Sequence, residues 1–96
     1  MRRNEILKIL REHSAEVEEF GVKSFAIFGS AARDEAREDS DVDVLVEFQR
    51  PPTFKVYMGL KFFLEDLLGK KVDLVSRVML KSRVRPYVER EAIYVT

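Results

Sequence analysis

Cysteine is absent from this 96-residue chain, and no apolar run in it approaches the length of a membrane-spanning helix. The first absence excludes disulfide bonds, thiolate chemistry and metal sites built on cysteine. The second argues against a transmembrane helix, which needs roughly 20 consecutive apolar residues. The N-terminal segment also has no apolar signal core. We therefore expect a cytoplasmic protein without a membrane partner.

An excess of charge of either sign is also missing, because 17 Lys and Arg residues balance 17 Asp and Glu residues. A domain that binds nucleic acid directly usually presents a basic face. We expect no direct nucleic-acid partner, although the balance leaves room for a local basic patch. The single histidine, His13, has no motif near it and is expected on a helix surface or in helix packing.

The spacing of apolar residues predicts alternating helices and strands. Helices are expected over about 2–20, 31–38, 54–68 and 79–90, and strands over about 24–28, 42–48, 71–75 and 93–95. Thr53 and Gly69 suit the two caps of the third helix, and Pro86 should kink or break the last helix. The pattern is that of an α/β domain, with a small mixed sheet of about three to four strands and helices packed on it.

Loop lengths predict how these strands pair. The helix between the second and third strands is a crossover long enough to make that pair parallel, whereas the shorter first connection favours an antiparallel pair. The aromatic residues of the third helix have helical spacing, and we expect core positions for them rather than a platform for a nucleobase. They are Phe54, Tyr57, Phe62 and Phe63.

Gly29 and Ser30 stand between the first strand and the helix that follows it. A glycine lets the backbone approach a ligand closely, and a helix N-terminus favours an anion such as phosphate. The Ser30 hydroxyl can add a hydrogen bond. On their own, however, the two residues are a weak signal and fit an ordinary turn better.

Three acidic residues interrupt apolar strands. Asp41 and Asp43 open the second strand two residues apart, which places both carboxylates on one face. Asp73 lies near the start of the third strand. Each has a simpler interpretation, as a solvated strand end for the first two and as an ion-paired or edge-strand acid for Asp73. In a parallel pair, however, all three gather at one end, and an antiparallel first pair brings Gly29 to that same end.

Three carboxylates beside a phosphate cradle suit phosphoryl transfer with two metal ions, because divalent cations relieve the repulsion between acids and bind phosphates. Asp43 would bridge the two ions. Asp73 would bind the ion on the nucleophile side or accept the acceptor's proton. Arg33 is a candidate for neutralising phosphate charge, with a solvated or ion-paired surface arginine as the alternative.

Three segments together resemble the minimal nucleotidyltransferases of the polymerase-β-like superfamily, whose pattern is G-S-x-x-R, D-x-D and a later Asp. They are Phe28–Arg33 (FGSAAR), Ser40–Val46 (SDVDVLV) and Val72–Val75 (VDLV). Three further stretches are similar to the antitoxin family called MntA, namely Pro51–Phe54, Leu60–Glu65 and Arg83–Val95.

The resemblance implies one nucleotidyltransferase domain over residues 1–96. By position it makes Asp41, Asp43 and Asp73 the catalytic and metal-binding acids, with Mg²⁺ as the metal. Gly29 and Ser30 match the phosphate-binding pair, and Arg33 matches the arginine of the pattern. It also implies a partner, a HEPN-type (HEPT) ribonuclease toxin, to which such antitoxins transfer AMP from ATP, on a tyrosine, within a possible hetero-oligomer.

Two other functions stay open at this stage. The chain could neutralise a toxin simply by masking it, with its acids vestigial. It could also transfer a nucleotide to a small molecule or to an RNA end. The complete set of acids counts against the first, and the balanced charge and short chain do not favour the second.

Overall fold

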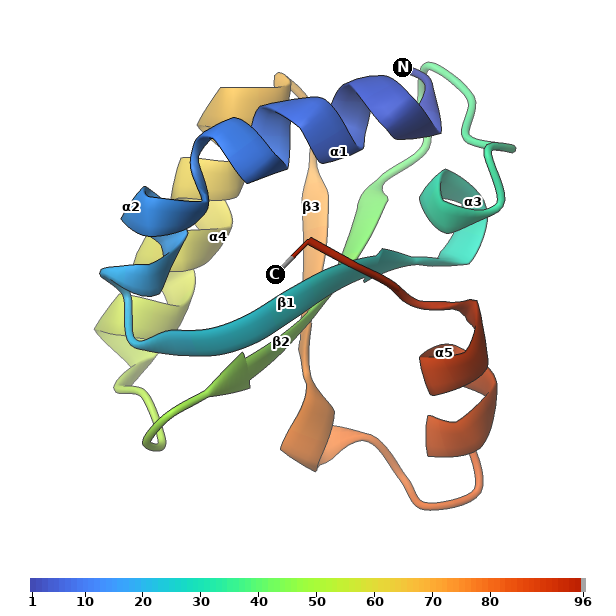
Figure 1. Ribbon diagram of the computed structural model, residues 1–96. Coiled ribbons are helices and arrows are strands. Elements are labelled where there is room, and N and C mark those ends of the chain that lie inside the picture. The colour runs from blue at the N-terminus through green and yellow to red at the C-terminus, as the bar shows by residue number, and fades with distance from the viewer. Residues whose placement is uncertain (96) are drawn as a thin grey trace.

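The computed structural model describes residues 1–95, so Thr96 of the expected 1–96 domain lies outside the described residues. The chain forms a four-stranded sheet in the order β3-β2-β1-β4, with helices on both faces (Figure 1). The helices are α1 (Arg3–Glu12), α2 (Ser14–Glu18), α3 (Gly29–Ala32), α4 (Phe54–Leu68) and α5 (Arg85–Glu91), with a 3₁₀ turn η1 (Arg77–Met79). The strands are β1 (Val22–Phe28), β2 (Val42–Phe48), β3 (Val72–Ser76) and β4 (Ile93–Tyr94).

The strand directions confirm the expected mixed α/β sheet. β1 is antiparallel to β2, and β2 is parallel to β3. The short strand β4 pairs antiparallel with the other side of β1. The ends of β1 and the starts of β2 and β3 therefore lie at the same end of the sheet.

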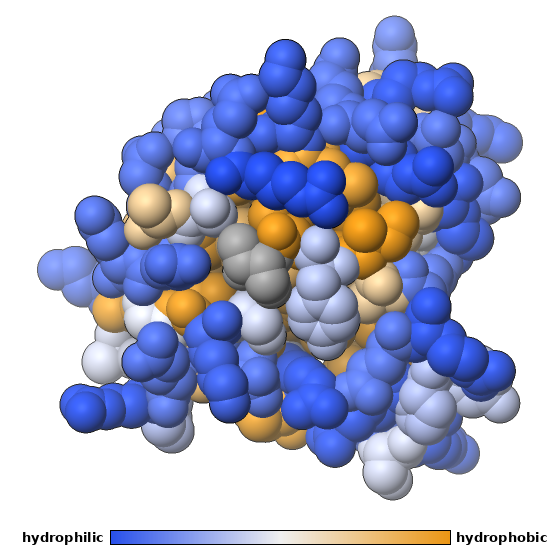
Figure 2. All heavy atoms as spheres, viewed as in Figure 1, coloured by the Kyte–Doolittle hydropathy of each residue, from blue (hydrophilic) through white to orange (hydrophobic). Residues whose placement is uncertain are grey.

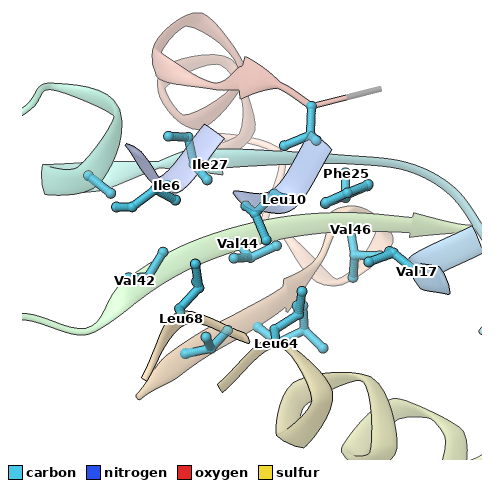
Figure 3. Close-up of a cluster of buried hydrophobic side chains, with 14 of the residues drawn as sticks. Ile6, Leu10, Val17, Phe25, Ile27, Val42, Val44, Val46, Leu64 and Leu68 are labelled. Carbon is cyan, nitrogen blue, oxygen red and sulfur yellow. The ribbon is translucent and has the colours of Figure 1, made fainter. Parts of the chain in front are cut away.

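One face of the sheet holds the main hydrophobic core, under α1, α2 and α4 (Figure 3). Alternate residues of each strand point into it, as the two-residue period of a strand requires. On the central strand these are Val42, Val44 and Val46, all nearly inaccessible to solvent. The helices contribute Ile6, Leu10, Val17, Leu60, Leu64 and Leu68.

The other face of the sheet is covered only in part. Its buried cluster consists of Ala26, Leu45 and Val88, and Val88 is the single buried residue of α5. In the view of Figure 2, charged and polar side chains cover α1 and the outline of the molecule, and apolar atoms reach the surface between α1 and α5. At the starts of β2 and β3, however, Asp43 is only partly buried and Asp73 is exposed, so this part of the face is open.

Two helices are shorter than the sequence predicts. The expected helix over 2–20 is divided at His13, whose φ of −114° and ψ of 16° leave the helical region. The expected helix over 31–38 begins at Gly29 and ends at Ala32. It ends there because Asp34 adopts a φ of 59°, and its carboxylate accepts a hydrogen bond of 2.9 Å from the backbone N–H of Arg3. Asp34 thus caps α1, which has no side-chain cap of its own.

The last helix also differs from the prediction. Pro86 lies in the first turn of α5 and does not kink it, because a proline there removes an N–H that would be unpaired in any case. Residues 80–84 link η1 to α5 without a continuous helix. Two of the aromatic residues expected in the core are exposed, Phe54 by 79% and Phe62 by 54%. Among residues 1–95, no helix has both the length and the apolar character needed to cross a bilayer.

The helix α4 was predicted correctly at both ends. The hydroxyl of Thr53 accepts a hydrogen bond from Val56 N–H at 3.1 Å, and Gly69 ends the helix with a φ of 65°. The same helix closes the outer edge of β3. Tyr57 donates its hydroxyl hydrogen to the carbonyl of Leu74, and Glu65 accepts from the backbone N–H of Val72 at 2.9 Å. Side chains of α4 thus satisfy polar groups that an edge strand would otherwise expose.

Replacing Tyr57 with phenylalanine tests this closure. The ring keeps its packing against Phe48, 6.2 Å between centroids, but the carbonyl of Leu74 loses its donor. We expect the free energy of unfolding to fall by about 1 kcal/mol, measured by urea denaturation. Tyr87→Phe is the control, because Tyr87 is 67% exposed. An equal, small effect of both substitutions would contradict the assignment.

Candidate active site

The central strand β2 places Asp43 between two other predicted site residues. In the sheet register Asp43 is opposite Asp73 of β3 on one side and Phe28, the residue before Gly29, on the other. Neighbouring strands lie about 4.8 Å apart, so the side chains of Asp43 and Asp73 stand next to each other on the open face. The prediction that the strand starts bring these two acids together is confirmed.

Gly29 lies directly against Asp43. It has a φ of 65°, a conformation that side chains disfavour. A methyl group on its Cα would overlap Asp43 Oδ2 and stand 3.1 Å from Cγ. Glycine is therefore required here twice, for its conformation and for the space. The space that a side chain would fill lies where the start of α3 adjoins the carboxylate of Asp43.

Asp41 and Ser30 flank this pair. Asp41 precedes the first residue of β2 and is exposed, whereas Ser30 is half-buried in the first turn of α3. With only four residues α3 has a weak dipole. Any phosphate binding there depends on the N–H groups and the Ser30 hydroxyl more than on the dipole that the sequence suggested.

The surroundings of Asp43 disfavour the ionised form of its carboxyl group. Desolvation by burial is the main reason that the pKa of Asp43 is raised, and the negative charges of Asp73 and then Asp41 raise it further. Arg33 acts in the opposite direction and is the smallest of these influences. A half-buried carboxylate beside two others is thus a place where a cation would be stabilising.

Arg33 is less free than the sequence suggested. Its Nε donates to Glu35 at 2.8 Å, and its Nη1 pairs with Glu91 at the end of α5. Its side chain is nevertheless 50% exposed. The arginine thus ties α3 to α5 beside the site, which supports the ion-paired alternative.

The donor set can be compared with what Mg²⁺ requires. Within residues 1–95, no three His, Cys, Asp or Glu side chains come close enough together to hold a metal ion by themselves. Asp43 and Asp73, however, offer adjacent carboxylates on an open face. Mg²⁺ commonly takes one or two carboxylates and completes its shell with substrate phosphates and water. The carboxylates of Asp43 and Asp73 therefore fit Mg²⁺ that binds together with a nucleotide. Asp41, two residues before Asp43, is a further candidate ligand.

One residue near the site was not predicted to belong there. Tyr57 was expected in the core, but its hydroxyl donates a hydrogen bond to the carbonyl of Leu74 at the edge of β3. Desolvation raises the pKa of its hydroxyl, and the charge of Asp73 raises it further. Its bond to Leu74 places the hydroxyl one residue along β3 from Asp73, a candidate site residue. The four-residue spacing of Tyr57, Lys61 and Glu65 on one stripe of α4 is the only sequence signal of this contact.

Residues 3–95 match the family model described as a nucleotidyltransferase domain. The chain is also 48% identical over 92 residues to the protein adenylyltransferase MntA of Thermococcus cleftensis. That alignment covers 95% of this chain and 93% of the relative.

Solved structures share the fold. One that is provisionally described as a minimal nucleotidyltransferase is 45% identical, with a TM-score of 0.83 over 97% of this chain and 95% of that one. A chain in the complex of a tri-AMPylated HEPN toxin with an MNT antitoxin from Shewanella oneidensis is 15% identical, with a TM-score of 0.69 over 94% of this chain and 71% of that one. From the family match over nearly its whole length and the identity to these relatives, the chain belongs to the nucleotidyltransferase domain family.

Proposed function

We propose that this nucleotidyltransferase is a Mg²⁺-dependent antitoxin that transfers AMP from ATP to a tyrosine of a cognate HEPN (HEPT) ribonuclease toxin and so neutralises it. The Thermococcus relative is named a protein adenylyltransferase, and the Shewanella structure joins an AMPylated HEPN toxin to its antitoxin. The first, at 48% identity, supports AMP transfer to a protein. The second supports a HEPN toxin as the protein that accepts it, within a hetero-oligomer. The proposed location of the pair is the cytoplasm.

The observation that carries this proposal is the register that sets Asp43 beside Asp73, with Gly29 against Asp43. Asp41, Asp43 and Asp73 are the proposed catalytic and metal-binding acids. In this proposal the backbone at Gly29 and the hydroxyl of Ser30 bind the β- and γ-phosphates, and Arg33 adds positive charge if it releases one of its glutamates. A triphosphate would thus extend from the end of β1 across the start of β2, with its α-phosphate towards β3.

The proposed roles of these groups give the following reaction. The tyrosine oxygen forms a bond to the α-phosphorus of ATP, the bond from that phosphorus to the bridging oxygen breaks, and pyrophosphate leaves towards Gly29. Asp73, on the outer strand, accepts the phenolic proton. Bound Mg²⁺ would supply the neutralisation of phosphate charge that two carboxylates alone oppose. Backbone N–H groups at Gly29 would orient the leaving group.

Transfer of label tests this function directly. The purified protein is incubated with Mg²⁺, ATP labelled at the α-phosphate, and the protein encoded beside it. We expect label on that neighbour, and none when EDTA is present. A tight complex without label would indicate an antitoxin that acts by masking. Neither label nor complex would direct the search to small molecules and RNA ends.

Asp43→Asn should remove the activity and keep the fold. The loss of a metal-binding carboxylate at the reacting centre is expected to lower the transfer rate by about 100-fold or more. Asp66→Asn, an exposed carboxylate on α4, is the matched control. Circular dichroism verifies that both variants fold. A rate near wild type for Asp43→Asn would overturn the assignment of the acids.

Two glycines allow a matched test of the cradle. Gly29 and Gly69 share a φ of 65°, but a methyl group would meet Asp43 at Gly29 and nothing within 4 Å at Gly69. For the left-handed backbone alone, alanine at either position should lower stability by about 1–2 kcal/mol. The overlap with Asp43 should add to the loss at Gly29. Only Gly29→Ala should also abolish AMP transfer. If both variants keep their activity, then the close approach of Gly29 to Asp43 has no role in the reaction.

Removing the charge of Asp43 should stabilise the metal-free protein at neutral pH. Burial, followed by the charges of Asp73 and Asp41, raises the pKa of Asp43 in the folded state. The folded state therefore binds this proton more tightly than the unfolded chain, and stability is lost as the pH rises through the folded pKa. Asp43→Asn escapes this loss.

The test is thermal unfolding in EDTA from acid to neutral pH. The Tm of Asp43→Asn should exceed that of wild type at neutral pH. The difference should shrink as the pH falls through the raised folded pKa towards 3.8, the ordinary pKa of an aspartate, and should be lost below it. A variant that is less stable than wild type at neutral pH would contradict the electrostatic account.

A further inference from the structure

A large apolar groove lies at the C-terminal end of β3, along the edge of the sheet. Its volume is about 680 Å³, and it is bounded by the β2–α4 connection, the first turns of α4, the end of β3 and η1. Its apolar lining includes Phe48, Phe54, Tyr57, Val75, Val78 and Met79. The groove thus joins segments from three parts of the chain at one edge of the sheet.

The rim of this groove is unusually exposed for apolar side chains. Phe54 is 79% exposed, Val78 74% and Met79 78%. Apolar residues scattered singly over a surface need no explanation, but several that gather at one groove mark a binding site. Methionine in particular adapts its shape to different apolar partners.

The groove adjoins the proposed active site on the side of Asp73. Val75 follows Asp73 by two residues in β3 and so lies on the same face, about 6.6 Å further along the strand. Tyr57 provides a second connection, because its ring lines the groove while its hydroxyl bonds to Leu74, the residue after Asp73.

The direction of the reaction assigns this side to the acceptor. Gly29, Asp43 and Asp73 follow one another across three adjacent strands, β1, β2 and β3. In an in-line displacement the attacking oxygen and the leaving oxygen are on opposite sides of the phosphorus. Because pyrophosphate leaves towards Gly29, the acceptor approaches from the β3 side of the sheet. The groove lies on that side, further along β3 towards its C-terminal end.

We propose that the groove formed by Phe54, Tyr57, Val75, Val78 and Met79 binds apolar or aromatic side chains flanking the acceptor tyrosine of the protein substrate. This inference rests on the proposed function. The groove would hold the acceptor segment while the phenolic oxygen reaches Asp73, so its contribution is to substrate binding and positioning. A nucleobase and a second copy of this chain are the competing occupants.

Phenylalanines on one helix give a matched pair of variants. Phe54→Ser removes an exposed ring from the groove, whereas Phe62→Ser removes one from elsewhere on α4, where Phe62 is 54% exposed. Met79→Ser tests the opposite rim. We expect Phe54→Ser and Met79→Ser to raise both the Kd of the complex with the neighbour-encoded protein and the KM for that acceptor, by about tenfold or more each. The Kd for a non-hydrolysable ATP analogue should stay unchanged, and Phe62→Ser should behave as wild type.

Three results would overturn the proposal. Weaker binding of the ATP analogue in Phe54→Ser would assign the groove to the base. A wild-type dimer that dissociates in Phe54→Ser, measured by light scattering, would assign it to a second copy. Acceptor Kd and KM values unchanged in both groove variants would leave it without a role in binding.

The same experiment separates this inference from the proposed function. If wild type labels the neighbour but the groove variants match it, the groove proposal alone fails. If wild type transfers no label while Kd still depends on Phe54 and Met79, then AMP transfer fails and the docking surface stands.

Discussion

The rest of the structure depends on the position of β2, between a strand that runs against it and a strand that runs with it. The antiparallel partner brings the end of β1, and with it Gly29, to the start of β2. The parallel partner brings Asp73 level with Asp43. A shift of either neighbour by one residue would turn its side chains to the other face. The register is in turn held by the valines of β2, which alternate with Asp43 and fill the opposite core.

This alternation places the residues of the main core on one face of β2 and the candidate site residue Asp43 on the other. The face that bears Val42, Val44 and Val46 is covered by three helices. The face that bears Asp43 is covered only in part, by α5, η1 and the connection between them. The repulsion that raises the pKa of Asp43 is therefore concentrated in one place, while a continuous hydrophobic core maintains the sheet. A small domain can tolerate such a site because the residues that stabilise it are not those that react.

The sequence predicted the features that depend on local chemistry. Thr53 and Gly69 cap their helix through contacts within a few residues, and loop lengths were enough to orient the strands. The acids could be brought together because strand direction and period fix where they point. The short α3 could not be foreseen, since Asp34 ends it while capping a helix 31 residues away. Tyr57 and the groove were missed for the same reason: they join segments that are distant in the chain.

The contacts that close the edge of β3 limit how another protein can be recognised there. The backbone N–H of Val72 and the carbonyl of Leu74 are already bonded to side chains of α4. These two groups are therefore not available to pair with a strand of another chain. Such a chain could not extend the sheet past them by adding a strand. A protein that binds beside Asp73 would then be recognised through contacts between side chains. The bound segment can be helical or irregular as readily as extended. Selection among targets would follow the shape and order of their apolar residues, with little dependence on backbone conformation.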